Sequence, residues 1–81
     1  MRAASASRST ILQPISLRAR NIVRRAGASA DKTFFSVSVE DEEPIAEAVA
    51  AGYLVLLRGH ADVWRITARG EDYLTQLRGA H

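Results

Sequence analysis

The sequence contains no cysteine, and it has only two prolines and one tryptophan among its 81 residues. The absence of cysteine excludes a disulfide framework and a thiolate metal site, and it favours a reducing compartment, so we expect a cytoplasmic protein. The longest apolar run, residues 48–57, is far shorter than the roughly 20 residues that a membrane span needs. Membrane partners are therefore not expected. The 47% hydrophobic and 25% charged residues that make up the chain are typical of one small globular domain.

Signatures of catalysis and of metal binding are missing as well. The sequence has two histidines, His60 and His81, and no phosphate loop, dinucleotide fingerprint or Gly-x-Ser-x-Gly elbow. The acidic run at residues 40–43 lacks the spacing of a calcium-binding loop. We therefore expect no enzymatic activity, no cofactor and no metal site.

The charges that are present are unevenly distributed along the chain. Residues 1–32 carry seven cations and one anion, residues 33–57 carry five anions and no cation, and residues 58–81 carry four cations and three anions. The three segments thus have net charges of +6, −5 and +1. Basic segments attract phosphate and the acidic segment repels it. This polarity is compatible with three kinds of partner: DNA, a basic protein, or a second copy of the chain in a homodimer.

Residues 1–10 are small, polar and basic, which predicts a flexible tail, although organelle transit peptides have a similar composition. Residues 11–81 are expected to form a single domain. A first helix begins after Pro14 with Ser16 as its cap, and Gly27 is expected to end it. Its apolar stripe has the 3.6-residue period of a helix and consists of Ile15, Ala19, Ile22, Val23 and Ala26.

Residues 33–39 alternate in the way that a half-buried strand does, with Phe35, Val37 and Val39 on the predicted buried side and Phe34 on the other. The acidic residues 40–43 and Pro44 predict the start of a second helix, because carboxylates favour the positive end of the helix dipole. This helix is expected to end near Gly52, and its predicted inward side chains are Ile45, Ala48 and Val49.

An antiparallel hairpin is predicted from strands at residues 53–57 and 63–67 around the polar turn 58–62. Its predicted buried face consists of Leu54, Leu56, Trp64 and Ile66. A last helix, residues 68–77, follows Thr67, which is expected to cap it, and its apolar face is Tyr73, Leu74 and Leu77. The order α-β-α-β-β-α predicts an α+β fold with a three-stranded antiparallel sheet.

The second half of the chain resembles a winged helix domain, also called a winged helix-turn-helix domain, of the bacterial repressor type. In that family the strand after the wing ends in a hydrophobic-Thr-x-x-Gly-x-x-x-Leu motif, and here Ile66, Thr67, Gly70 and Leu74 match it. The resemblance covers about residues 42–77 and implies a winged-helix-like domain. The family has two helices between its first strand and the wing. Here only residues 40–51 lie there, enough for one helix or for a turn followed by one helix.

Two functions remain open at the level of sequence. The resemblance implies a small DNA-binding, transcription-regulatory protein of bacterial or phage type, which would contact DNA through the basic helix and the wing: Arg18, Arg20, Arg24, Arg25, Arg58, His60 and Arg65. The alternative is a protein-protein interaction module (an adaptor, phage-type regulator or inhibitor) that uses the acidic helix: Glu40, Asp41, Glu42, Glu43 and Glu47. Carboxylates at the start of a groove-reading helix would repel phosphates, but the helix dipole alone also accounts for them.

Overall fold

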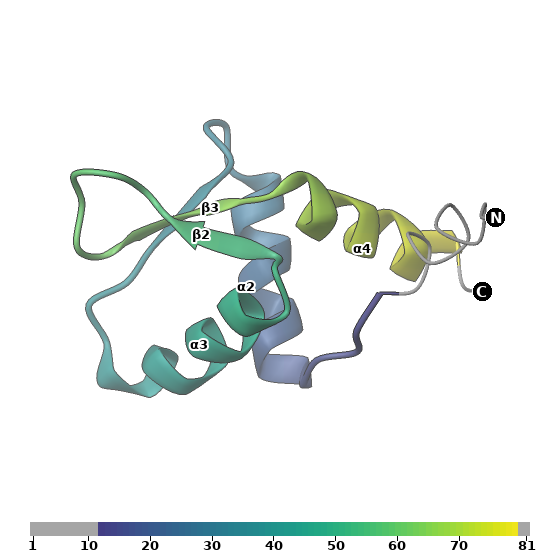
Figure 1. Ribbon diagram of the computed structural model, residues 1–81, viewed down its shortest axis with the longest axis horizontal. Helices are drawn as coiled ribbons and strands as arrows, with labels where there is room; N and C mark the ends of the chain where they lie inside the picture. The colour runs from purple at the N-terminus through teal and green to yellow at the C-terminus, as the bar shows by residue number, and fades with distance from the viewer. Residues whose placement is uncertain (1–11, 80–81) are drawn as a thin grey trace, which may run out of the picture.

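The computed structural model describes residues 12–79, so the predicted tail at residues 1–10 lies outside the described part of the chain (Figure 1). The elements are α2 (Leu17–Ala28), β1 (Thr33–Phe35), the 3-10 turn η1 (Val39–Asp41), α3 (Glu42–Ala50), β2 (Leu54–Leu56), β3 (Val63–Ile66) and α4 (Ala68–Gly79). This order confirms the predicted α+β class, with η1 as an additional turn before α3. None of the helices within residues 12–79 is long and apolar enough to cross a membrane.

The three strands form one antiparallel sheet in the order β1-β3-β2, so β3 is central and pairs with both neighbours. Trp64 is paired with Phe34 on one side and with Leu56 on the other, which places these three side chains on the same face of the sheet. Helix α2 packs against β1, β3, α3 and α4 and is therefore the centre of the domain.

Helix α2 follows the predicted apolar stripe. The Ser16 hydroxyl accepts a hydrogen bond from the amide of Ala19 at 3.2 Å and caps the helix, as expected. The core that this helix joins is made of Ile15, Ala19, Ile22, Val23, Ala26, Phe34, Ile45, Ala48, Ala51, Tyr53, Leu54, Ile66 and Tyr73. The prediction that Gly27 ends the helix is wrong, because α2 continues to Ala28. A Cβ atom at Gly27 would lie 2.7 Å from Leu74 Cδ1, so the glycine instead allows α4 to approach α2.

The predicted buried side of the first strand is wrong. Only Thr33–Phe35 pairs as a strand, and Phe34 is buried, whereas Phe35, Val37 and Val39 are 64%, 73% and 76% exposed. The reason is the register: Phe34 is opposite Trp64 on the inner face, and a shift of one residue exchanges the two faces of a strand. The apolar residues after Phe35 are therefore left at the surface.

The connection between the sheet and α3 consists of a turn and one helix, the second of the two predicted forms. Ser38 caps η1 by accepting a hydrogen bond from the amide of Glu40. At the other end of α3, Gly52 has a φ of +86°. Two backbone hydrogen bonds end the helix there: the amide of Gly52 donates to the carbonyl of Val49, and the amide of Tyr53 donates to the carbonyl of Ala48. This is the Schellman pattern, in which glycine adopts the left-handed conformation without a steric penalty.

The threonine-glycine motif fixes the start of α4. The Thr67 hydroxyl donates to Gly52 O at 2.6 Å and accepts from the amide of Gly70 at 2.9 Å, so it joins the end of α3 to the start of α4. A Cβ atom at Gly70 would clash with the Tyr53 carbonyl oxygen, which confirms that the motif places the helix directly against the sheet. One turn further along α4, the ring of Tyr73 is stacked on the ring of Tyr53, with centroids 4.5 Å apart.

Candidate functional site

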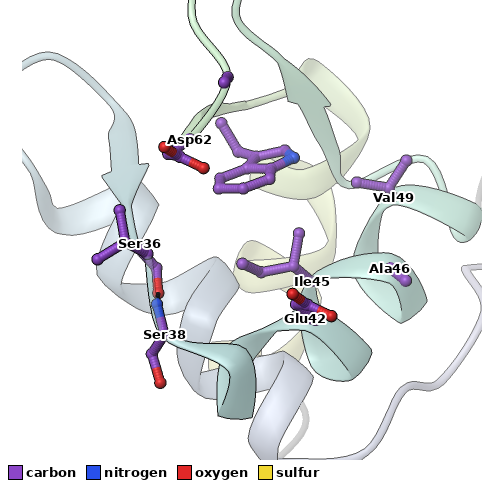
Figure 2. A pocket seen from close by; sticks show the side chains of 10 residues that line it. Ser36, Ser38, Glu42, Ile45, Ala46, Val49 and Asp62 are labelled. Atoms are coloured by element: carbon purple, nitrogen blue, oxygen red, sulfur yellow. Dashed lines mark hydrogen bonds between the residues drawn. The ribbon is translucent and has the colours of Figure 1, made fainter.

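The largest hollow described lies between α3, the segment 36–38 that follows β1, and the β2–β3 hairpin; we call it the α3–hairpin groove. Its volume is about 410 Å³, within the range of sites that hold ligands. Figure 2 shows Asp62 on one side of the opening, Glu42 on the opposite side, Ser36 and Ser38 along a third side, and Val49 across from them. The lining residues are Ser36, Val37, Ser38, Glu42, Ile45, Ala46, Val49, Ala61, Asp62 and Trp64.

The groove lies where α3, the segment 36–38 and the β2–β3 hairpin do not pack fully against one another. Leu56, which the sequence predicts to be buried, is 49% exposed, and Trp64 is only half-buried although both lie on the inner face. Ile45 closes the floor from α3, and Val49 on the same helix remains 40% exposed. The unfilled space between helix and hairpin is thus mainly apolar.

The charged residues of the groove all have the same sign. Glu42 and Asp62 are the two ionisable side chains among its ten lining residues, so no cation lines it. Within residues 12–79, neither carboxylate makes a hydrogen bond or an ion pair. Ser36 connects the segments that carry these two carboxylates. Its amide donates a hydrogen bond to the backbone carbonyl of Asp62 at 3.1 Å, and its hydroxyl donates one to the carboxylate of Asp41, next to Glu42, at 2.5 Å.

Of the five acidic residues predicted for a protein interface, one lines the groove. This is Glu42, while Glu43 is exposed on α3 outside it. The Asp41 carboxylate accepts a hydrogen bond from the Ser36 hydroxyl. The backbone carbonyl of Glu40 accepts a hydrogen bond from Arg18 Nη2 at 2.6 Å.

Glu47 has a structural role. Its carboxylate accepts hydrogen bonds from the amide of Ser16 at 2.7 Å and from the Ser16 hydroxyl at 2.8 Å. These two bonds lower its pKa below the ordinary value of 4.5. Glu47 therefore attaches α3 to the start of α2 and is not part of the groove.

Glu42 is the one groove residue among the predicted site residues. Of the others, Asp62 is expected from the sequence in a turn, and Val49 and Trp64 are expected in the core. One signal was available in the sequence, because the segment between the first strand and Gly52 is too short for two helices and cannot cover the whole inner face of the sheet.

The residues predicted to bind nucleic acid lie in several separate places. Arg58 and His60 are exposed in the hairpin loop, at one end of the molecule in Figure 1. Arg65 is exposed on the outer face of the sheet, opposite Thr33 and Val55.

The four arginines of α2 lie in three different surroundings. Arg18 and Arg25 line a shallow hollow of about 160 Å³ together with Asp41, and Arg25 lies over the Phe34 ring at 5.4 Å. Arg24 lines a second hollow, between α2 and α4, of about 340 Å³. Arg20 is half-buried, and within residues 12–79 its buried Nε has no hydrogen-bond partner.

The second hollow is the most basic one described. Lys32 and Arg78 line it with Arg24, and Glu71 is its one acidic residue. Lys32 Nζ donates to the Gly27 carbonyl at 2.9 Å, at the C-terminal end of α2. Cations at that end of a helix are stabilised by its dipole, which accounts for this cluster without a ligand.

Comparisons with models of protein families, with curated proteins and with solved structures found no match to this chain. The likeness to winged helix domains therefore stays a prediction from the sequence motif. In the described part of the chain, no group of three or more His, Asp or Glu side chains is placed to hold a metal ion.

Proposed function

We propose that this chain is a protein-protein interaction module of winged-helix-like topology, and that it binds a protein partner in the α3–hairpin groove. The observation that carries the proposal is the composition of the groove: its floor and walls are apolar, with Val37 and Val49 exposed, and two carboxylates that have no partner within residues 12–79 stand at its rim. Apolar surface surrounded by polar groups is typical of protein docking sites. A phosphate backbone at the same place would be repelled by both carboxylates.

Nucleic-acid binding is the second candidate. It is favoured by the exposed Arg58 and His60 in the wing-like loop, since basic side chains at such a tip can contact phosphate or enter a minor groove. It ranks second because Glu42 on α3 and Asp62 in the hairpin put two carboxylates on the face with which a winged helix would have to approach DNA.

Site-directed photo-crosslinking in cells tests the first candidate. A photoreactive amino acid replaces Ala46, which is exposed and lines the groove, and in a matched control it replaces Asp72, which is exposed on α4. We expect a discrete protein adduct from position 46 that is absent from position 72 and is lost when Val49→Glu is added. Equal adducts from both positions, or adducts with nucleic acid alone, would contradict the proposal.

The second candidate is tested with a labelled DNA duplex, by fluorescence anisotropy at about 50 mM and about 200 mM salt. If the chain binds DNA through the wing, binding weakens steeply between these concentrations, because phosphate contacts release counterions. The double variant Arg58→Ala, His60→Ala would then bind more weakly than the control Arg78→Ala. The absence of binding at the lower salt concentration would remove this candidate.

A further inference from the structure

We infer that the occupant of the α3–hairpin groove is a basic peptide segment: an aliphatic anchor side chain with a lysine or arginine on each side of it. This inference rests on the proposed function and specifies the partner. The occupant is part of another protein, and the features that define it are its charge and its anchor.

The floor of the groove determines the anchor. Ile45, Val49 and Trp64 offer an apolar surface from two elements, and Val37 adds a third side. A volume of about 410 Å³ accommodates a few side chains and excludes a folded domain, so the contact is with a segment. Aliphatic side chains fit because contact with an apolar wall removes their surface from water.

The rim determines the charge. Glu42 lies in the first turn of α3 and Asp62 lies in the hairpin, on opposite sides of the opening (Figure 2). An occupant must cover part of one or both carboxylates, and a covered carboxylate without a partner is unfavourable. A cation on each side of the anchor satisfies both carboxylates, whereas an acidic segment adds repulsion.

The chain contains its own spectroscopic probe for this inference. Trp64 is the only tryptophan in the sequence, and it lines the groove while half-buried. Any occupant therefore changes the environment of this ring, and its emission should shift to shorter wavelength as water is displaced.

The experiment titrates the full chain with three 12-residue peptides and follows the emission of Trp64. All three carry the same central pair of leucines, which are flanked by lysines, by serines or by glutamates. We expect the lysine peptide to bind about tenfold more tightly than the glutamate peptide, since each exposed ion pair contributes a factor of about 2 to 5. This preference should shrink as salt is raised, because the pairs are screened.

Two double variants identify the carboxylates that are responsible. Glu42→Gln with Asp62→Asn should abolish the preference for lysine over glutamate. The matched control, Glu71→Gln with Asp72→Asn, changes the net charge equally on α4 and should retain it. Circular dichroism of each variant verifies that the fold is intact, which is expected because Glu42 and both α4 carboxylates are exposed and the Asp62 carboxylate makes no hydrogen bond or ion pair within residues 12–79.

Three outcomes overturn the inference. One is the absence of any response to the lysine peptide at millimolar concentration, and another is equal binding of the three peptides. The third is a shift of the Trp64 emission that depends on the concentration of the protein alone and disappears with Val49→Glu, because the occupant is then a second copy of the chain. Protein crosslinks at position 46 together with any of these results would leave the proposed function intact and refute only the basic segment.

Discussion

At the scale of single residues, Glu47 shows how one carboxylate holds two helices together. Its two carboxylate oxygens accept hydrogen bonds from the amide and the hydroxyl of Ser16. The same hydroxyl accepts a hydrogen bond from the amide of Ala19 at the start of α2. The two hydrogen bonds stabilise the charged form of Glu47 and lower its pKa below 4.5. Asp31 has a lowered pKa for the same reason, since it accepts the hydroxyls of Ser29 and Thr33.

We predict that Glu47→Gln destabilises the fold at neutral pH and that the effect depends on pH in one direction. Because the folded pKa lies below the unfolded value, the stabilisation by Glu47 is complete above about pH 4.5 and is lost as the pH falls through the folded pKa. The difference in unfolding free energy between wild type and variant should therefore shrink between pH 5 and pH 3. Urea denaturation across this range measures it. A difference that stays constant would contradict the role assigned to the ionised carboxylate.

The second residue-scale prediction concerns Gly70. A methyl group there would meet the Tyr53 carbonyl oxygen and would lie 2.7 Å from Ile66 Cγ1, and the backbone oxygen cannot move away cheaply. We expect Gly70→Ala to lower the unfolding free energy by about 1–3 kcal/mol, the range for overpacked interiors. The control is Gly79→Ala, which meets nothing within 4 Å and should be close to neutral. Thermal unfolding of both variants measures the difference in stability. If Gly70→Ala is as stable as Gly79→Ala, the prediction is wrong and α4 adjusts its position.

At the scale of elements, the motif at the start of α4 was the most predictable feature. Thr67 and Gly70 have roles that follow from their chemistry: a hydroxyl that caps the helix and a missing side chain where a helix approaches a strand. The apolar stripe of α2 was predictable for a similar reason, because its period is a property of the helix itself.

Features that depend on pairing between distant segments were not predictable. The alternation around Phe35 is real, but the register with Trp64 decides which of its two faces is buried. The groove likewise depends on how α3 packs against the hairpin and the segment 36–38, and no local pattern records that packing. A sequence reports which side chains are apolar but not which of them a neighbouring element leaves uncovered.

The element-scale prediction concerns the joint between α3 and α4. Thr67→Ala removes the hydrogen bond to the Gly52 carbonyl and the cap of α4 together, and we expect it to cost about 1–2 kcal/mol. Thr67→Ser keeps the hydroxyl and should recover most of this stability. Thr75→Ala, at an exposed position of the same helix, should change stability by no more than about 0.5 kcal/mol. Denaturant midpoints for the three variants test the joint, and a Thr67→Ala variant as stable as Thr75→Ala would refute it.

At the scale of the whole molecule, folding brings part of the basic segment and part of the acidic segment together. Arg18 donates to the Glu40 carbonyl, and Arg18 and Arg25 share a hollow with Asp41. Opposite charges that lie beside each other within one chain attract a second chain less than the separation along the sequence suggests. The polarity of the sequence thus overstates the polarity of the folded surface.

We therefore predict that head-to-tail self-association driven by charge is weak. Sedimentation velocity at about 20 mM and about 300 mM salt should give a monomer under both conditions. A dimer that appears only at the lower salt concentration would contradict this prediction and would indicate that the two charged segments pair between chains.

The segment that leads into α2 has a practical consequence. It is attached twice, since the Tyr53 hydroxyl donates to the Gln13 carbonyl and Ser16 donates to Glu47, and it begins at the opposite end of the molecule from the hairpin (Figure 1). A tether joined to the chain ahead of Gln13 would hold the domain on a sensor surface with the hairpin directed away from the support. Immobilised in this orientation, the protein would present the hairpin and the α3–hairpin groove to molecules in the flowing buffer.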